Sequence, residues 1–386
     1  MSEKIPKGWK WVKLGEVLNS GSFELLDRYR IPLSDNQRNK MKDGILYPYY
    51  GANGIIDYVN RYIFYGEFIL VAEDGTVSTD KGKPVVQYVC GKFWVSNHAH
   101  VIKCENSITL KFLYYALKNV DIIPYITGAV QPKLNQRNLL DIEILYALDI
   151  NEQKAIAEVL SSIDDKIDLL HRQNKTLEEM AMTLFRQWFI EPTKDRLPEG
   201  WEEVSLGEIV KISSGKGLNK KDFVENGLYP VLGSNGEIGR TNNFLFNDKL
   251  IFTGRVGTLG NVFISEGKVW LSDNTIVVKP ISQEYFYFVY FFLKMSKLEE
   301  LNVGSTQPLI RQTDLKELDI IIPDKETINK FHKFVEQIFN KIKYNKHQIR
   351  TSEQLRDTLL PKLMSGEVRV KYVFKFIKKE KNYGKN

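Results

Sequence analysis

The sequence predicts an α+β protein in which two mixed α/β domains are separated by two long helices that form an antiparallel coiled coil, as a pseudo-two-fold internal repeat. Three observations predict this fold class. A set of short motifs occurs twice, about 180 residues apart; each copy contains strand-like runs broken by turns; and each copy is followed by a long heptad pattern. A chain of 386 residues is also too long for one ordinary core.

The repeat is visible as matching motifs that keep the same order in both halves. The separation between partners drifts only slightly along the chain, which small loop insertions explain. Two similar but non-identical copies suit a protein that binds two related but different targets. The matching motifs are Pro6-Lys7-Gly8-Trp9 with Pro198-Glu199-Gly200-Trp201, Leu14-Gly15-Glu16-Val17 with Leu206-Gly207-Glu208-Ile209, Tyr47-Pro48 with Tyr229-Pro230, Gly51 with Gly233, Asn53-Gly54 with Asn235-Gly236, Gly75-Thr76 with Gly257-Thr258, Trp94 with Trp270, and Gln131-Pro132 with Gln307-Pro308.

Each copy begins with a strand-rich part. β-Branched and aromatic residues form short runs, and turn dipeptides such as Asn53-Gly54 and Asn235-Gly236 separate them. A short amphipathic helix is expected at about 110–118 in the first copy and about 283–294 in the second. Each part is therefore a mixed α/β domain of roughly 140 residues, a reasonable size for one core. The expected strands include 63–65, 68–71, 85–89 and 93–95 in the first copy, and 250–252, 262–264 and 275–278 in the second.

A helix of about 38 residues, roughly 57 Å long, is expected after each strand-rich part. Seam residues recur there at alternating spacings of four and three, which is typical of a helix that packs along another helix. A lone helix of this length would leave its apolar seam exposed to solvent, so the simplest arrangement pairs the two helices. The seam positions are Ile156, Leu160, Ile163, Ile167, Leu170, Asn174, Leu177, Ala181, Leu184 and Trp188 in the first helix, and Ile328, Phe331, Val335, Ile338, Ile342, Asn345, Ile349 and Ser352 in the second, with Leu355 and Leu359 after a slip.

Two asparagines in the seam predict the direction of the helices. Asn174 and the first-copy counterpart of Asn345 straddle the helix midpoint, so antiparallel packing brings the two asparagines together. A buried asparagine pair costs stability but fixes register and orientation. The alternative is that one or both asparagines are simply exposed.

The composition indicates a globular protein with a mild preference for a polyanionic partner. The hydrophobic share is 43%, the charged share 26%, and the formal net charge +6 with a pI of about 8.9. No apolar run approaches the length of a membrane helix, and Met1-Ser2-Glu3-Lys4 lacks a signal-peptide core. Cys90 and Cys104 have no C-x-x-C spacing, which argues against a disulfide scaffold or a zinc site. A reducing, cytoplasmic setting fits best.

Several motifs resemble those of the specificity subunit of type I restriction–modification enzymes. The short motifs are individually weak, but they appear in the expected order, doubled, and cover nearly the whole chain. In the second helix, Phe331-His332 replaces Ile156-Ala157 of the first, so its N-terminal signature is degraded. The segments that carry the resemblance are 151–157, 163–167, 184–189 and 198–201 for the central conserved region, 359–367 for the distal conserved region, and 304–308 with a looser version at 128–132.

The resemblance implies two target recognition domains on an antiparallel two-helix spacer. Each domain would read one half of a split, asymmetric sequence in double-stranded DNA, and the spacer would set the gap in units of the helical turn, roughly 34 Å. The divergence of the two copies explains why the half-sites should differ. The expected boundaries are 1–150 for the first recognition domain, 151–190 for the first spacer helix, 191–325 for the second recognition domain, 326–370 for the second spacer helix, and 371–386 for a basic C-terminal tail that either adds nonspecific DNA affinity or has no role.

The resemblance also implies partners in the prokaryotic cytoplasm. The chain would recruit two adenine methyltransferase subunits through the spacer and neighbouring domain faces, and motor–nuclease subunits would join for restriction; no membrane is involved. S-adenosylmethionine, ATP and Mg²⁺ would belong to those partners, and this chain would hold no cofactor and no catalytic site.

The motifs present in the chain agree with a non-catalytic role. The chain has no Asn/Asp-Pro-Pro-Tyr/Phe motif, and the loop 213–217 does not fit a P-loop; it is either a plain turn or a loop with Lys216 near phosphate. Pro323-Asp324-Lys325-Glu326 resembles a nuclease motif only superficially and fits a helix start with Asp324 as the cap. A packing or loop role is favoured over metal binding for His98 and His100.

DNA-contacting residues should lie on loops that project from each domain. Direct readout needs Arg, Lys, Asn, Gln or acidic groups within reach of base edges, while lysines hold phosphates. Gln131 and Gln307 sit in a shared motif, so a role in the fold is at least as good an interpretation for them. The candidates are Lys81, Lys83, Asn97, His98, Gln131, Lys133, Asn135, Gln136 and Arg137 in the first copy, and Lys216, Lys220, Arg255, Asn261, Gln307 and Arg311 in the second.

Two other functions remain open from the residues alone. The chain could be a stand-alone DNA-binding nuclease with an unrecognised catalytic site, or a scaffold that binds no DNA. The missing catalytic motifs argue against the first, and the duplicated loops with the positive charge argue against the second. Neighbouring methyltransferase and helicase–nuclease genes would discriminate between a subunit and a stand-alone enzyme.

Overall fold

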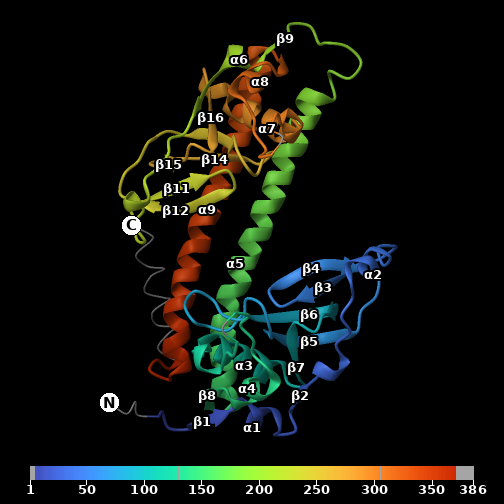
Figure 1. The fold of residues 1–386 in the computed structure, drawn as a ribbon, viewed down its shortest axis with the longest axis vertical. Coiled ribbons are helices and arrows are strands. Elements are labelled where there is room, and N and C mark those ends of the chain that lie inside the picture. The colour runs from blue at the N-terminus through green and yellow to red at the C-terminus, as the bar shows by residue number, and fades with distance from the viewer. Residues whose placement is uncertain (1–4, 129, 305, 371–386) are drawn as a thin grey trace. The chain divides into compact units, whose positions relative to one another are not determined.

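The computed structural model describes residues 5–128, 130–304 and 306–370. The chain divides into two compact units (Figure 1). Unit 1 takes the N-terminal part up to Leu169 together with the C-terminal part from Gln348, and unit 2 is Leu170–His347. The basic tail expected at 371–386 lies outside the described residues.

Unit 1 contains the first strand-rich part, and its elements follow the predicted mixture of strands and short helices. They are β1 (Trp9–Lys13), α1 (Leu14–Leu18), β2 (Phe23–Leu25), η1 (Asp27–Tyr29), α2 (Asp35–Asn39), β3 (Tyr47–Gly51), β4 (Gly54–Val59), β5 (Phe64–Ala72), β6 (Val86–Val95), β7 (Ala99–Cys104), α3 (Ser107–Asn119), η2 (Ile123–Tyr125), α4 (Gln136–Asp141) and β8 (Glu143–Ala147).

Unit 2 contains the second strand-rich part. Its elements are β9 (Glu202–Ser205), α6 (Leu206–Ile209), β10 (Val210–Ser214), η4 (Lys220–Asp222), β11 (Tyr229–Gly233), β12 (Gly236–Thr241), β13 (Leu250–Gly254), β14 (Val262–Ser265), β15 (Trp270–Leu271), β16 (Thr275–Pro280), η5 (Gln283–Tyr285), α7 (Phe286–Met295), η6 (Leu298–Leu301), α8 (Gln312–Lys316) and β17 (Asp319–Ile322). The long helices α5 (Ile150–Phe185), which continues as the π-helical turn η3 (Arg186–Ile190), and α9 (Lys325–Met364) each contribute to both units.

The main sheet of unit 1 has the strand order β2-β7-β5-β6-β3-β4, and β1 pairs separately with β8. The sequence predicts two short strands at 63–65 and 68–71, but the structure joins these runs into the single strand β5. The same correction applies to 85–89 and 93–95, which form the single strand β6. The breaks that the sequence suggests are Gly66 and Gly91, which face each other across the β5–β6 pair with φ of 131° and 93°. Glycine tolerates these positive φ values inside a strand.

In unit 2 the corresponding strands form separate sheets, with the orders β10-β16-β13-β14 and β12-β11-β15, while β17 pairs with β9. The division occurs because the strand that corresponds to β6 is interrupted and appears as β14 and β15.

The helix predicted at 283–294 is present as η5 and α7, but it is not amphipathic. Seven residues of α7 are buried, so this helix lies inside the unit 2 core.

The shared sequence motifs occupy the same places in the two units. The hairpins β3–β4 and β11–β12 each close on an Asn-Gly dipeptide, and each has a register shift at the same point. A Cβ atom on Gly51 would lie 3.1 Å from Ile56, and one on Gly233 would lie 3.0 Å from Ile238. These glycines are shared because a larger residue would displace the isoleucine packed over them.

The heptad seam predicted for the long helices is confirmed over most of its length. Near the end of the first helix the seam differs from the prediction: Phe185 and Phe189 are buried, whereas the predicted Leu184 and Trp188 are only partly buried. In unit 1, Ile156, Leu160, Leu363 and Met364 belong to one buried cluster with the domain core. Lys166 donates to Gln348 at 3.1 Å, and Arg356 donates to Asp164 at 3.0 Å. The residue numbers rise along one helix as they fall along the other, so the segments run antiparallel in this unit.

The helices also run antiparallel within unit 2. Asn345 donates from Nδ2 to Oδ1 of Asn174 at 2.9 Å, and the rings of Phe185 and Phe331 lie 6.0 Å apart. The two seam asparagines are therefore buried against each other rather than exposed. At the start of α9, Asp324 accepts from the backbone N–H of Thr327 at 2.9 Å. This contact confirms the helix-cap interpretation of that acidic segment.

Candidate nucleic-acid interface

Three loops of unit 1 meet at one end of its sheet, and backbone hydrogen bonds hold them together. The N–H of Glu73, just after β5, donates to the carbonyl of His98 at 2.9 Å. The carbonyl of Glu73 accepts from the N–H of Leu134 at 2.7 Å. Glu73 thus ties the turn before β7 to the loop before α4, and most first-copy candidates lie on these loops.

Unit 2 repeats this arrangement of three loops joined by backbone hydrogen bonds, which we call the frame, with different side chains. The N–H of Arg255 donates to the carbonyl of Asn274 at 2.8 Å, and the carbonyl of Arg255 accepts from the N–H of Ile310 at 2.9 Å. Arg255 therefore occupies the place of Glu73, and Arg311 occupies the place of Asn135. The backbone is the same in both units, while an acid is exchanged for a base at its centre.

A shared glycine shapes the loop before α4 and α8. A Cβ atom on Gly128 would lie 2.3 Å from the carbonyl oxygen of Gln131, and one on Gly304 would lie 1.9 Å from that of Gln307. Real Cβ atoms do not approach backbone so closely, so only glycine fits. The shared Gly-x-x-Gln spacing is thus a backbone requirement of the loop, and both glutamine side chains are exposed.

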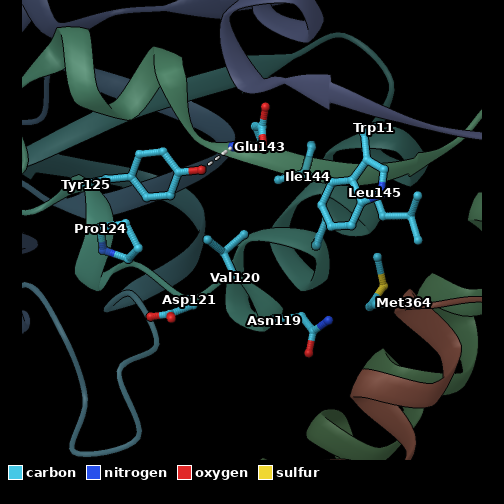
Figure 2. A pocket seen from close by; sticks show the side chains of 11 residues that line it. Trp11, Asn119, Val120, Asp121, Pro124, Tyr125, Glu143, Ile144, Leu145 and Met364 are labelled. Atoms are coloured by element: carbon cyan, nitrogen blue, oxygen red, sulfur yellow. Dashed lines mark hydrogen bonds between the residues drawn. The ribbon is translucent and has the colours of Figure 1, made fainter. Parts of the chain in front are cut away.

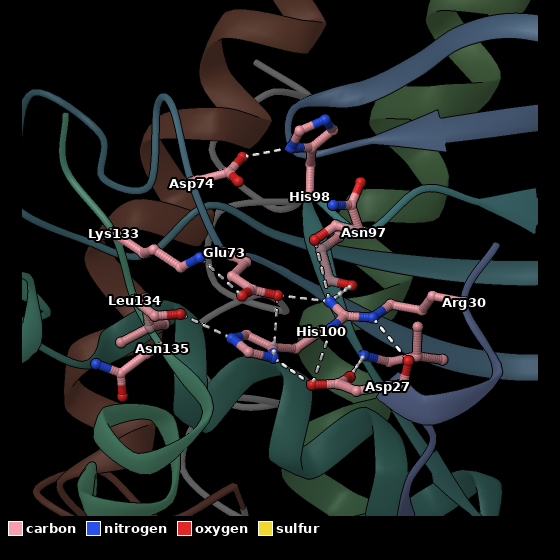
Figure 3. Close-up of polar contacts among 12 residues, drawn as sticks. Asp27, Arg30, Glu73, Asp74, Asn97, His98, His100, Lys133, Leu134 and Asn135 are labelled. Carbon is pink, nitrogen blue, oxygen red and sulfur yellow. Dashed lines mark hydrogen bonds and ion pairs between the residues drawn. The ribbon is translucent and has the colours of Figure 1, made fainter. Parts of the chain in front are cut away.

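Unit 1 also places a charged network beneath these loops (Figure 3). Arg30 donates from Nη1 to Glu73 Oε2 at 2.6 Å and to the Ala99 carbonyl at 2.8 Å. His100 is fully buried; its Nε2 donates to the carbonyl of Leu134 at 2.8 Å, and its Nδ1 lies 2.5 Å from Asp27 Oδ2. The network connects η1, β5, β7 and the loop before α4, so it fixes the frame in place.

The same network explains a group of residue types that could hold a metal. Ligand atoms of Asp27, Glu73 and His100 lie within 4.8 Å of one another. The guanidinium of Arg30 contacts both carboxylates, at 2.6 Å for Glu73 and 3.7 Å for Asp27. Arginine therefore supplies the positive charge that these partly buried carboxylates require.

The comparisons with known proteins agree with this doubled frame. The family described as type I restriction modification DNA specificity domain matches residues 6–179 and 198–353, one match for each repeat. The chain belongs to this family.

Two curated relatives come from Methanocaldococcus jannaschii. The chain is 30% identical to the type I restriction enzyme MjaIX specificity subunit over 69% of this chain and 71% of the relative. It is 24% identical to the MjaVIII specificity subunit over 95% of each. The crystal structure of a type I restriction–modification S subunit from M. genitalium has the same fold, with a TM-score of 0.62 at 20% identity, over 94% of this chain and 97% of that one. The protein is thus a specificity subunit, the DNA-recognising and non-catalytic component of such systems.

Five first-copy candidates of this specificity subunit have their side chains engaged within unit 1. Each makes a contact that holds the loop: the Nζ atom of Lys81 lies 3.4 Å from Asp357, Lys83 donates to the Asn119 carbonyl at 2.7 Å, His98 lies 2.7 Å from Asp74, the Nζ atom of Lys133 lies 3.4 Å from Glu73, and Asn135 caps α4 by accepting from the Asn138 N–H at 2.9 Å. If one of these side chains binds DNA, it must either keep its present partner at the same time or give up that contact.

The remaining first-copy candidates are exposed. They make no side-chain hydrogen bond or ion pair with other residues in the described part of the chain. These candidates are Asn97, Gln131, Gln136 and Arg137. Gln136 and Arg137 lie in the first turn of α4, directly after the loop that the buried network holds.

The second-copy candidates are less engaged. Asn261 donates to Asn235 Oδ1 at 3.0 Å, which joins its loop to the β11–β12 turn. Arg255 is half-buried, the others are exposed, and within the described ranges none of them has a side-chain hydrogen bond or ion pair. These are Lys216, Lys220, Arg255, Gln307 and Arg311. The structure brings Arg255 and Arg311 together through the Ile310 hydrogen bond, whereas Lys216 and Lys220 lie on another loop.

Sequence reasoning missed the residues that hold the first frame. Asp27, Arg30 and Glu73 were not candidates, because they are far apart in the chain and carry no motif. One signal was available: aligning the repeats places the acid Glu73 opposite the base Arg255 beside a shared Gly-Thr motif. A charge reversal next to a shared motif marks a position where two readers differ.

A hollow of about 310 Å³ in the specificity subunit does not suit nucleic acid (Figure 2). It lies where the β1–β8 pair meets the end of α3, and it is lined by apolar residues together with the acids Asp121 and Glu143. Trp11 on its wall is 54% exposed. The carboxylates would repel phosphate, and none of the candidate DNA-binding residues lines this hollow.

No helix among the described residues is long and apolar enough to span a membrane.

Proposed function

We propose that this specificity subunit reads a bipartite, asymmetric DNA target, with one half-site for each repeat. The supporting observation is the shared backbone frame with exchanged side chains, in which Glu73 and Asn135 of unit 1 correspond to Arg255 and Arg311 of unit 2. Two identical frames would read the same sequence twice. Because Glu73 and Asn135 are engaged within unit 1 whereas Arg255 and Arg311 are not, the two frames offer different side chains to the bases.

The contacts proposed for unit 2 follow from the chemistry of its free side chains. Arg255 and Arg311 can each donate two hydrogen bonds to one guanine in the major groove. Gln307 can pair with adenine in the same way, while Lys216 and Lys220 suit phosphate oxygens. In unit 1, Gln131, Gln136 and Arg137 are the corresponding free groups.

The gap between the half-sites is proposed to depend on the helices α5 and α9. They contain 36 and 40 residues, which corresponds to roughly 54 to 60 Å of helix at about 1.5 Å per residue. The Asn174–Asn345 pair would fix their register, because only one alignment of the seam brings the two amides together. A fixed register would make the number of unread base pairs constant.

The partners are proposed from the family. The subunit would recruit two adenine methyltransferase subunits, and motor–nuclease subunits would join for restriction. S-adenosylmethionine, ATP and Mg²⁺ would be held by those partners. Two repeats give two equivalent docking places, which supports the number of methyltransferase subunits.

The test is modification-sensitive sequencing of DNA from cells that co-express this chain with its neighbouring methyltransferase, compared with cells that lack this chain. We expect a split motif with N6-methyladenine in both halves, which disappears without this chain. Arg255→Gln and Arg311→Gln should each relax one position in one half of the motif and leave the other half unchanged. If the complex forms but the modified sites show no split motif, the proposal is wrong.

A further inference from the structure

Unit 1 carries a lysine, Lys92, that is held over three aromatic rings; the most distant is Tyr65, whose ring centroid lies 6.0 Å from the lysine Nζ atom. The Nζ atom of Lys92 lies 4.9 Å from the ring centroid of Tyr62 and 5.7 Å from that of Tyr47. The rings of Tyr62 and Tyr47 meet edge to face with their centroids 5.1 Å apart. This arrangement holds a cation over the rings by their electron-rich faces.

Unit 2 carries a corresponding cluster of a lysine and two rings with similar dimensions, in which the Nζ atom of Lys268 also donates to the Tyr229 hydroxyl at 3.5 Å. The Nζ atom of Lys268 lies 4.8 Å from the ring centroid of Phe244 and 5.5 Å from that of Tyr229. These rings also meet edge to face, with their centroids 5.5 Å apart. The outer rings are equally exposed, at 42% for Tyr62 and 44% for Phe244.

The two clusters occupy matching positions in the repeat. Tyr47 and Tyr229 begin the shared Tyr-Pro motif, and each lysine stands two residues before the shared tryptophan, Trp94 or Trp270. Next to the outer rings, the N–H of Ile63 donates to Phe93 at 3.0 Å, and the N–H of Leu245 donates to Val269 at 2.9 Å. The cluster therefore recurs at matching positions in the two copies of the repeat.

The charge of each lysine is left uncompensated. Lys92 and Lys268 are exposed, and neither has a carboxylate partner within the described part of the chain. By contrast, Lys279 in unit 2 is paired with Asp248 at 2.6 Å. The aromatic rings restrict the lysine stem without neutralising its ammonium, so each cluster presents an oriented positive charge to solvent.

The position of the cluster suits a contact beside the bases. In unit 2 the β11–β12 turn touches the reading frame through the Asn261–Asn235 hydrogen bond. Tyr229 is at the opposite end of β11 from that turn, roughly 13 Å along the strand at about 3.3 Å per residue. The major groove is about 12 Å wide, so a frame seated in the groove would place such a lysine near the flanking backbone.

We propose that Lys92 and Lys268 are phosphate anchors that bind the DNA backbone beside the two half-sites. The inference rests on the proposed function, because a residue that both readers keep should meet something that both half-sites share. Base sequences differ between the half-sites, whereas phosphate is the same everywhere. The anchors hold the reading loops in register on the duplex without reading sequence.

The test measures how salt weakens DNA binding by the complex formed with the co-expressed methyltransferase. Lys92→Met and Lys268→Met keep a stem over the rings and remove the charge. Each should reduce the slope of log affinity against log salt by about 0.9, and the double variant by about twice that amount. Lys92→Arg should restore the slope. The matched control is Lys279→Met, which changes net charge equally but removes a lysine already paired with an acid.

Two duplexes separate this inference from the proposed function. One contains the modified motif found by sequencing, and the other lacks it. The slope should fall on both duplexes, and the methylated motif should keep the same sequence in every variant. If the wild-type complex recognises a split motif but the variants keep the wild-type slope, the anchors are overturned and the proposed function stands. Equal slopes with a lowered melting temperature would assign the clusters to the fold alone. If the complex binds both duplexes equally and modifies no motif, the proposed function fails while the slopes still test the anchors.

Discussion

Asn345 donates its side-chain amide to Oδ1 of Asn174 at 2.9 Å, in a seam whose neighbouring positions include the apolar Leu170 and Ile342. Asn345 is fully buried, and its own Oδ1 atom has no hydrogen-bond partner among the described residues. The pair gives the Asn345 Nδ2 group a hydrogen-bond acceptor but leaves the Asn345 Oδ1 atom buried without a donor. A leucine pair would avoid that cost, so the asparagines are better explained by register than by stability.

Replacing one asparagine should destabilise unit 2 more than replacing both. Asn174→Leu removes the acceptor at 2.9 Å and leaves the buried Asn345 amide with only the longer contact to Gln173 Oε1 at 3.4 Å. The change should lower the free energy of unfolding by about 1 to 3 kcal/mol. The double variant Asn174→Leu/Asn345→Leu should be at least as stable as wild type. Urea unfolding followed by helical circular dichroism measures both changes. A double variant no more stable than the single one would contradict this account.

Asp164 should be important for joining both long helices to the unit 1 core. It accepts from the Tyr115 hydroxyl at 2.9 Å and from Arg356 at 3.0 Å. Burial and the Asp164 carboxylate raise the pKa of Tyr115, so its hydroxyl remains a donor. Asp164→Ala leaves the Tyr115 hydroxyl without its acceptor, while Arg356 keeps only its hydrogen bonds to Asp357. The change should lower the free energy of unfolding by about 2 kcal/mol. Thermal unfolding checks this, with the exposed neighbour Asp165→Ala as the control, which should change stability by no more than about 0.5 kcal/mol.

Gly304 should tolerate no side chain. Because a Cβ atom there would lie 1.9 Å from the Gln307 carbonyl oxygen, Gly304→Ala must displace the loop before α8, at a cost of about 1 to 3 kcal/mol. Gly217→Ala is a matched control, since its Cβ atom would make an ordinary 3.5 Å contact with Asp273. Melting temperatures compare the two variants. An unchanged melting temperature for Gly304→Ala would show that the loop can rearrange freely.

Asp57 should make stability depend on pH at the acidic end. Hydrogen bonds from Lys42, the Tyr58 backbone and Arg38 lower the pKa of this carboxyl to about 2 from its usual 3.8. A lowered folded-state pKa stabilises the protein above the unfolded pKa, and the increment is lost as pH falls from about 4 towards 2. The stability difference between wild type and Asp57→Asn should therefore be constant at neutral pH and shrink over that range. Denaturant unfolding at several pH values measures it, and a difference that grows on acidification would exclude the ion pairs as its cause.

The long helices could be predicted because their signal is periodic and local. Every seam position from Ile156 to Leu170 carries an apolar residue at heptad spacing, and the structure buries each of them. The direction followed from two polar exceptions, Asn174 and Asn345. The environment of α7 could not be predicted in the same way, because Phe286–Met295 is apolar on nearly every face, and its boundary as a buried helix depends on what surrounds it.

The candidate site was predictable only as a set of loops. Repeat alignment located the frame, but Lys83 and Asn135 were chosen by residue type, and the structure engages them with the Asn119 carbonyl and the α4 N-terminus. The contacts of Arg30 with Glu73 and Ala99 join positions far apart in sequence. No local pattern encodes such contacts, so they required the tertiary structure.

The division of the chain has a consequence for biosynthesis. Unit 2 is one continuous segment, whereas the core of unit 1 includes Leu363 and Met364 from the far end of α9. A ribosome that has reached His347 has delivered every residue of unit 2 but none of the α9 residues that close unit 1. The strand-rich part made first must therefore wait for the helix end made last, and a prematurely terminated chain would retain a complete second unit beside an open first one.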